Sequence, residues 1–277
     1  MRYRASALGV LFALNVAAVQ AGTMGPVQIV PTEKVYFGVF GGGGSSNHVK
    51  IKQYGTAFFL ESAVVEGPLA VNAFGHSDKR DVGMIGGQVG YSWQDIPFSN
   101  QPLSLSPAVE LEGYYLGKSS FRSDDVINIT PRLSEHDFHV TYPLKSGVFL
   151  VNSVLNFSSA NYARWRPYVG AGIGAAVLSI SHANSLQTEP LEAGINHYNG
   201  NTSDKLATFA AQAKVGLNFA FSEHLSVFGE YRWLYMADTK FLFGSTIYPN
   251  HAATSSWTAN LGSQNYNLGA AGIRYAV

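Results

Sequence analysis

The chain has 277 residues, no cysteine, and equal numbers of basic and acidic side chains, 18 Lys and Arg against 18 Asp and Glu. Without cysteine it forms neither disulfides nor thiol sites, and without an excess of basic residues we expect no nucleic-acid partner. Charged residues make up 13% of the chain, against about 25% in soluble domains, and aromatic residues make up another 13%. Few charges, many aromatic residues and no apolar run of helix length after the first residues favour a membrane β-barrel.

The first 21 residues are predicted to be a cleaved signal peptide. Arg2 and Arg4 precede an apolar run over residues 5–19, and the small-residue pattern VQA ends at residue 21. A membrane-anchor helix is the alternative, but the run is shorter than the roughly 20 apolar residues that such a helix needs. Residues 22–33 then form a short periplasmic lead-in, which leaves 34–277 for the barrel.

Alternation with period two recurs along the rest of the chain and predicts β-strands. In a membrane barrel, alternation turns one set of side chains toward lipid and the other toward the interior. We therefore predict an all-β protein, a transmembrane antiparallel up-and-down β-barrel of about eight strands. The strands are expected at 34–42, 83–93, 107–117, 147–157, 166–175, 211–221, 225–235 and 263–277.

Long polar connections alternate with short turns between these strands, which is the asymmetry of outer-membrane barrels. The long connections, at about 47–82, 118–146, 181–206 and 238–262, are predicted to be extracellular loops, with 136–142 as an alternative extension of the strand that follows the second loop. Two apolar patches in the first loop either form an extracellular hairpin or add a membrane-spanning pair, which would raise the count to ten strands. Because Glu61 and Glu66 stand between short patches, and a spanning strand needs about 9–11 residues, the hairpin is preferred.

Aromatic residues near the ends of the predicted strands indicate two girdles at the membrane interfaces. A girdle near the periplasmic edge is predicted to contain Trp93, Phe157, Tyr168, Phe221 and Tyr275, and one near the outer edge Tyr115, Trp233 and Tyr235.

The inward face of the strands carries three acidic and three basic side chains. Buried charges must be paired, and the interior of an eight-stranded barrel is just wide enough for side chains to fill it. We therefore predict a structural ion-pair network that plugs the barrel, with a conducting path as the alternative. The network consists of Glu110, Glu112, Lys214, Glu230, Arg232 and Arg274.

Two segments resemble a known family. Gly272, Tyr275 and Val277 resemble the carboxy-terminal assembly signal of bacterial outer-membrane barrels, and the segment RPYVGAGIG over 166–174 resembles the fifth strand of a group of them. Over nearly its whole mature length the chain is similar to the eight-stranded surface-antigen barrels, namely the OmpA transmembrane domain and the opacity-type and Ail/OmpX-type proteins. The resemblance implies location in the outer membrane of a Gram-negative bacterium. It also implies contact with outer-membrane lipid and lipopolysaccharide, and with the outer-membrane assembly machinery.

Other candidate sites have weaker support. The glycines of 170–175 fit a loose dinucleotide fingerprint, but they lie inside one continuous strand, whereas that motif needs a strand, a turn and a helix. Glu110 and Glu112 could form a catalytic carboxylate pair, but a filled barrel offers no substrate cleft. Of the eight histidines only His136 and His139 are closely spaced, and nothing completes a zinc set. We therefore predict no catalytic residue, no cofactor and no metal.

These observations together favour a non-enzymatic protein, a structural surface antigen whose four loops mediate adhesion or contact a host-surface ligand. Long loops carry function when a rigid scaffold supports them. A small porin that passes small solutes is the alternative, and a barrel-type outer-membrane enzyme is less favoured.

Overall fold

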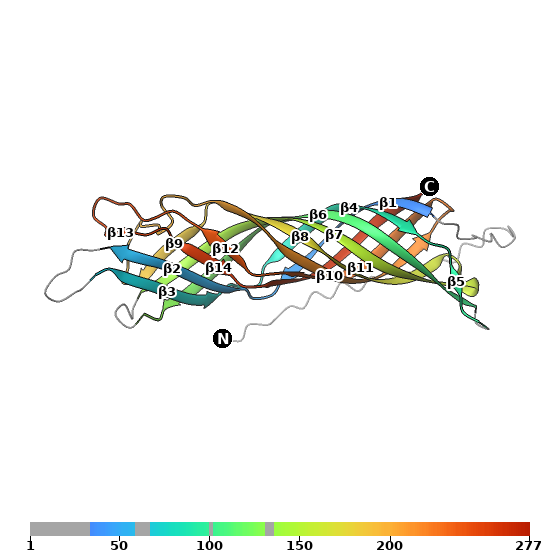
Figure 1. The fold of residues 1–277 in the computed structure, drawn as a ribbon, viewed down its shortest axis with the longest axis horizontal. Helices are drawn as coiled ribbons and strands as arrows, with labels where there is room; N and C mark the ends of the chain where they lie inside the picture. Colours follow the sequence, from blue (N-terminus) through green and yellow to red (C-terminus); the bar gives the residue numbers. More distant parts are fainter. Residues whose placement is uncertain (1–33, 59–66, 100–101, 131–135) are drawn as a thin grey trace, which may run out of the picture.

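The computed structural model describes residues 34–58, 67–99, 102–130 and 136–277, so the predicted signal peptide and lead-in lie outside the described residues. Among the described residues, eight antiparallel strands close into one ring, seen lengthwise in Figure 1. The ring runs in the order β1 (Lys34–Ser46), β4 (Asp81–Ser92), β6 (Leu103–Asn128), β7 (Asp137–Ser159), β8 (Trp165–Ile180), β10 (Asp204–Ala220), β11 (Leu225–Met236) and β15 (Gln264–Ala276), and β15 pairs with β1.

The connections contain shorter elements. Within the same described ranges these are seven strands and one 3-10 helix, Ala160–Tyr162. The strands are β2 (Lys50–Phe58), β3 (Leu69–His76), β5 (Ile96–Pro97), β9 (Asn184–Glu189), β12 (Thr239–Leu242), β13 (Ala253–Thr254) and β14 (Thr258–Leu261).

The eight-stranded ring confirms the predicted fold class. β1 pairs directly with β4, from Lys34 with Ser92 to Ser45 with Asp81, although β2 and β3 lie between them in the sequence. The hairpin of β2 and β3 is therefore not inserted into the ring, which excludes the ten-stranded alternative.

The strands of the ring are strongly tilted. Following the pairings once round the ring from Tyr235 leads to Leu225, which lies ten residues away on the same strand. With a rise of about 3.3 Å per residue and strands about 4.8 Å apart, this stagger corresponds to a tilt of about 40°. A barrel of eight strands at this tilt encloses room for side chains alone.

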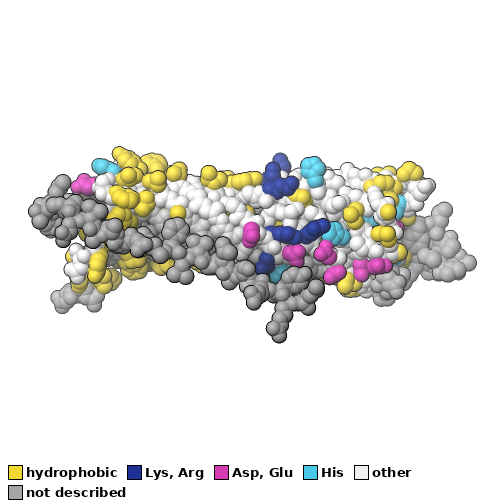
Figure 2. Space-filling model, turned by 180° about the vertical axis from the view of Figure 1, so that it is seen from behind, with side chains coloured by type: hydrophobic (Ala, Val, Ile, Leu, Met, Phe, Trp, Pro, Cys, Tyr) yellow, Lys and Arg dark blue, Asp and Glu magenta, His cyan; other side chains and the backbone are white. Residues whose placement is uncertain are grey.

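The outer surface differs between the two halves of the barrel. Near the C-terminus the outward side chains are apolar or aromatic, and many are well exposed, for example Ile85 at 67% and Ile173 at 63%. On the face in Figure 2, charged side chains gather on the other half, which carries β2 and β3. We call the apolar half the belt. A continuous exposed apolar surface of this kind matches the lipid-facing band of a membrane barrel.

Among the described residues, no helix is both long and apolar enough to cross a membrane.

β6 and β7 continue well beyond the belt, which corrects the prediction of a polar loop over 118–146. They stay paired up to Ile127 with Asp137, with two register shifts on the way. Their inward side chains, such as Phe121 and Phe138, are buried. The outward ones are largely polar, because this part of the wall lies past the belt. Beyond the belt, β6 and β7 thus still alternate between buried inward and more exposed outward side chains, although the outward ones are no longer apolar.

The other long connections extend the same wall. β3 pairs with the end of β6, β14 pairs with β2, and β9 pairs with the beginning of β7. We call this end of the barrel, formed by β2, β3, β9, β12, β13, β14 and their connections, the tip. The predicted loops 47–82, 181–206 and 238–262 are therefore partly strands. Buried aromatic side chains fill the tip, among them Phe138, Tyr142, Tyr198, Phe243 and Trp257.

Candidate functional site

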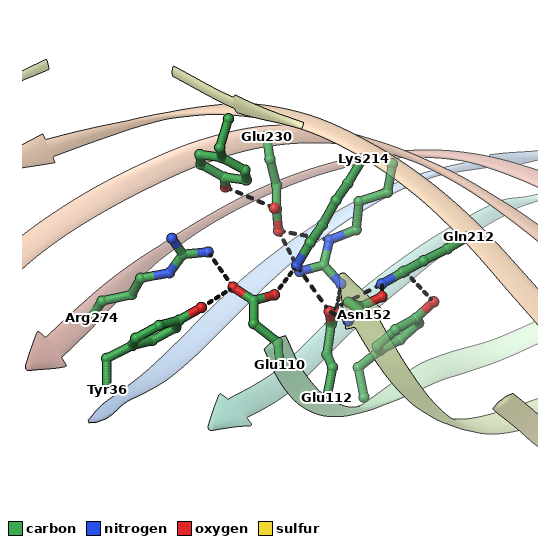
Figure 3. Close-up of polar contacts among 11 residues, drawn as sticks. Tyr36, Glu110, Glu112, Asn152, Gln212, Lys214, Glu230 and Arg274 are labelled. Carbon is green, nitrogen blue, oxygen red and sulfur yellow. Dashed lines mark hydrogen bonds and ion pairs between the residues drawn. The ribbon is translucent and has the colours of Figure 1, made fainter. Parts of the chain in front are cut away.

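All six charged residues predicted for the lumen are buried in the barrel interior, and we call them the charged layer. Figure 3 labels five of them and shows their charged groups pointing toward one another, namely Glu110, Glu112, Lys214, Glu230 and Arg274. Glu110 and Glu112 come from β6, Lys214 from β10, Glu230 and Arg232 from β11, and Arg274 from β15. Five of these side chains have no exposed area, and that of Arg274 is 8% exposed. Alternation along four strands is what brings them to one side of the wall.

Lys214 joins the two glutamates of β6. Its ammonium pairs with Glu110, and its Nζ lies 3.2 Å from Oε2 of Glu112. Glu112 also accepts hydrogen bonds from Nδ2 of Asn152 at 2.9 Å and from Nε2 of Gln212 at 3.1 Å. Because every carboxylate oxygen needs donors once it leaves water, these amides help to make burial of Glu112 tolerable.

Arg232 connects β11 to β6. Its guanidinium pairs with Glu112 and with Glu230, and its Nε lies 2.7 Å from Oε1 of Glu230. The guanidinium carbon also lies 4.1 Å from the centre of the Phe40 ring. Arg232 is thus held by two charges and by the rings of Phe40 and Tyr114.

Arg274 binds Glu110 from the opposite direction. Its Nη2 lies 3.2 Å from Oε1 of Glu110, which also accepts a hydrogen bond from the Tyr36 hydroxyl at 2.7 Å. The guanidinium packs 4.5 Å from the centre of the Phe228 ring. Three carboxylates therefore meet three cations, so the layer is electrically balanced.

Inward-facing glycines let tyrosines reach these glutamates. Tyr36 pairs with Gly90, and Gly90 pairs with Glu110 on the next strand. The Tyr36 ring lies over Gly90, where a β-carbon would collide with it, and its hydroxyl bonds Glu110. A large side chain thereby spans an intervening strand, because that strand contributes no side chain there.

An apolar layer closes the lumen between the charged layer and the tip. It contains Tyr114, Leu116, Val148 and Leu150 on one side and Leu178, Leu234, Tyr266 and Leu268 on the other. All of these side chains are buried. Among the described residues, these side chains belong to one buried hydrophobic cluster that fills the lumen at this level.

On the opposite side of the charged layer the lumen is polar and partly hollow. A cavity of about 110 Å³ is lined by Tyr36, Asn156, Arg166, Asn218 and Arg274, among others. It lies at the end with short turns, next to His224 and Ala276. The interior is therefore a shallow vestibule that ends at Arg274 and Tyr36.

Of the eight aromatic residues predicted to form girdles, seven lie on the outer face and one does not. Trp93, Tyr115, Phe157, Phe221, Trp233 and Tyr275 are exposed there, and Tyr235 is half-buried beside Trp233. The prediction for Tyr168 is wrong. It is fully buried in the lumen, and its hydroxyl donates to Oε2 of Glu230 at 2.8 Å. Tyr168 has the same parity as the inward Gly170, so the alternation itself places it inside.

The predicted assembly signal ends β15. Tyr275 and Val277 are exposed on the outer face, whereas Gly272 points inward. A β-carbon at Gly272 would press on the rings of Phe228 and the side chain of Phe40, which come from the two flanking strands. Packing inside the barrel thus explains why glycine occupies position 272, independently of any role in assembly.

A second polar cluster lies in the tip and was not predicted. Glu192, His197 and His251 offer ligand atoms that all lie within 4.8 Å of one another. His197 is buried, and burial lowers its pKa to about 4. Burial likewise lowers the pKa of His136, which lines a cavity at the tip together with the three residues of the cluster. The residues belong to two connections far apart in sequence, so no spacing pattern reveals the cluster.

The family model described as outer membrane protein beta-barrel domain matches residues 7–271. No curated protein matches the sequence.

Several solved structures are similar to this chain at low identity. OprG of Pseudomonas aeruginosa is 14% identical, with a TM-score of 0.38, over 89% of this chain and 97% of that one. Neisserial surface protein A is also 14% identical, with a TM-score of 0.31, over 87% of this chain and 96% of that one. The attachment invasion locus protein Ail of Yersinia pestis is 9% identical, with a TM-score of 0.28, over 86% of this chain and 99% of that one.

Proposed function

The chain belongs to the outer membrane protein β-barrel domain family and lies in the bacterial outer membrane, and we propose that it acts as a non-enzymatic surface protein through contacts made by its tip. The observation that carries the proposal is the double closure of the lumen. A charged layer around Arg232 and an apolar layer around Leu150 fill the interior within the described residues. A barrel filled in this way leaves its ends as the surfaces open to partners.

The construction of the tip supports a binding role. Its strands continue the wall of the barrel, and aromatic side chains such as Tyr198 and Trp257 pack its interior. A tip with this packing is preorganised, so binding a partner requires little ordering of the chain. Preorganised binding surfaces on a rigid scaffold are the common arrangement for loop-mediated recognition.

Exposed apolar side chains on the tip offer a contact surface. Leu191 and Ile247 are 77% and 69% exposed. Their connections are held together, since Nδ2 of Asn199 donates to the carbonyl oxygen of Ile247 at 2.8 Å. Large apolar side chains that remain exposed away from the belt favour binding to another macromolecule, such as a host-surface ligand, a matrix component or a neighbouring protein.

Adhesion of whole bacteria tests the proposal. Cells that express the chain in an otherwise non-adherent strain should bind epithelial cells or matrix-coated surfaces better than cells with an empty vector. The double variant Leu191→Asp/Ile247→Asp should lose this binding, while Lys118→Ala, on the wall outside the tip, should retain it. Deletion of the whole connection over residues 183–204 would be a poorer test. It would remove Tyr198, which is buried in the tip, and would therefore disturb the fold. Binding equal to that of the empty vector on every surface would overturn the proposal.

A further inference from the structure

The cluster in the tip has the chemistry of a metal site. Nε2 of His251 lies 3.1 Å from Oε2 of Glu192, and Nε2 of His197 lies 3.5 Å from the same oxygen. Four-coordinate zinc bound to nitrogen and oxygen at about 2.0–2.2 Å separates its ligands by about 3.3–3.5 Å. Each histidine nitrogen thus lies at nearly the distance from the Glu192 oxygen that one zinc ion would impose, and all three ligand atoms lie within 4.8 Å of one another.

The two imidazole rings are oriented as metal ligands are. Nδ1 of His197 lies 3.1 Å from the carbonyl oxygen of Ser185, and Nδ1 of His251 lies 2.6 Å from that of Ala252. A carbonyl oxygen can only accept, so each Nδ1 carries the proton. In the neutral ring the lone pair is then on Nε2, which faces Glu192. A backbone carbonyl behind each histidine is the usual second partner of a metal-bound imidazole.

Packing fixes the position of His197 further. Its ring packs against those of Phe138 and Trp257, at centroid distances of 5.2 and 5.4 Å, and these two rings also contact each other. In neutral rings, two nitrogen lone pairs and a carboxylate oxygen would face one another with no proton between them. A cation at their centre turns this unfavourable arrangement into a favourable one.

We propose that Glu192, His197 and His251 bind one divalent transition-metal ion of the zinc class. Three protein ligands of this kind leave a fourth coordination position open. They line a cavity of about 190 Å³, in which a water molecule or an added ligand can take that position. His136 lines the same cavity, and within the described residues its buried Nδ1 has no hydrogen-bond partner.

Metal uptake by the purified mature protein tests the site. The chain, freed of any histidine tag and treated with EDTA in detergent micelles, is dialysed against ZnCl₂, and bound zinc is counted per chain. We expect one zinc ion per wild-type chain. Glu192→Gln and His251→Ala should each weaken zinc binding by about 100-fold. Loss of a residue that only holds a metal ligand in place weakens binding by up to about 100-fold, and loss of a ligand itself should have at least that effect. His139→Ala is the matched control, because His139 lies on β7 beside β9 of the tip but pairs with Asp124. This variant should bind zinc as the wild type does.

A wild-type chain that takes up no zinc, or variants that bind it as tightly as the wild type, would overturn the proposal. Cobalt replaces zinc in a second measurement that needs no variant and so does not depend on variant folding. The wild-type protein with Co²⁺ should show the intense visible bands of a four- or five-coordinate ion. A spectrum that shows only the weak bands of hydrated six-coordinate cobalt would also overturn the proposal.

Discussion

The Tyr168 hydroxyl reaches across the neighbouring strand to donate a hydrogen bond to Glu230, with 2.8 Å between the two oxygens. The residue between them in register is Gly216, which pairs with Tyr168 on one side and with Glu230 on the other. The Tyr168 ring lies where a side chain of Gly216 would be. The bond thus ties β8 to β11 over β10 inside the lumen.

Substitution of Gly216 should disrupt this arrangement. The added methyl group of Gly216→Ala would lie 2.5 Å from Cζ of Tyr168, and because that ring is buried the clash cannot be relieved by moving into solvent. We expect a loss of about 1–3 kcal/mol in the free energy of unfolding, the usual effect of overpacking. Urea unfolding in lipid vesicles, followed by tryptophan fluorescence, measures it.

Gly229→Ala is the control for this variant. Gly229 lies on the adjoining strand β11 and pairs with Leu217, and no atom lies within 4 Å of its missing β-carbon. Its free energy of unfolding should remain within about 0.5 kcal/mol of the wild-type value. Equal losses for the two alanine variants would show that the tyrosine does not occupy the space over Gly216.

Removal of the Tyr168 hydroxyl should also destabilise the barrel. In Tyr168→Phe the Glu230 carboxylate keeps Arg232 but loses its donor from β8, which should lower the free energy of unfolding by about 1–3 kcal/mol. Tyr275→Phe, on the belt, should change it by less than about 0.5 kcal/mol. If Tyr275→Phe proved the more damaging of the two, the placement of Tyr168 in the lumen would be contradicted.

The charged layer should respond differently to single and double substitutions. Arg232→Met leaves Glu230 without its nearest cation, and breaking a buried pair in this way destabilises by about 3–5 kcal/mol. Adding Glu230→Gln removes the uncompensated charge, so the double variant should be more stable than Arg232→Met alone. Urea unfolding of both single variants and the double variant yields the coupling free energy. Strictly additive losses would mean that Arg232 and Glu230 do not act as a pair.

Much of the barrel could be predicted from the sequence. Alternation with period two defines the inward and outward faces, so it indicated eight strands and the inward position of Glu110, Lys214 and Arg274. Tyr168 was also predictable, since it shares the parity of Gly170, but its aromatic ring at a strand end favoured the girdle. Which inward residues contact one another depends on the register between neighbouring strands, and this register could not be read from the single sequence.

The tip was harder to predict for two reasons. Beyond the belt the outward side chains of β6 and β7 become polar, so the segments resemble loops although Phe121 and Phe138 remain inward. The Glu192, His197 and His251 cluster forms only when connections on either side of β10 and β11 fold against each other. The strand extension keeps its alternation but lacks the apolar outward residues that mark a membrane strand, and the cluster leaves no local pattern.

Electrical conductance tests the central claim, that the lumen is closed, most directly. The refolded mature protein should show no reproducible current steps in a planar lipid bilayer. Arg274→Ala should be silent too, because the apolar layer around Leu150 and Leu234 still closes the barrel when one cation of the charged layer is removed. Reproducible steps from the wild type, with amplitudes that change in Arg274→Ala, would contradict the closed lumen and identify the protein as a small porin.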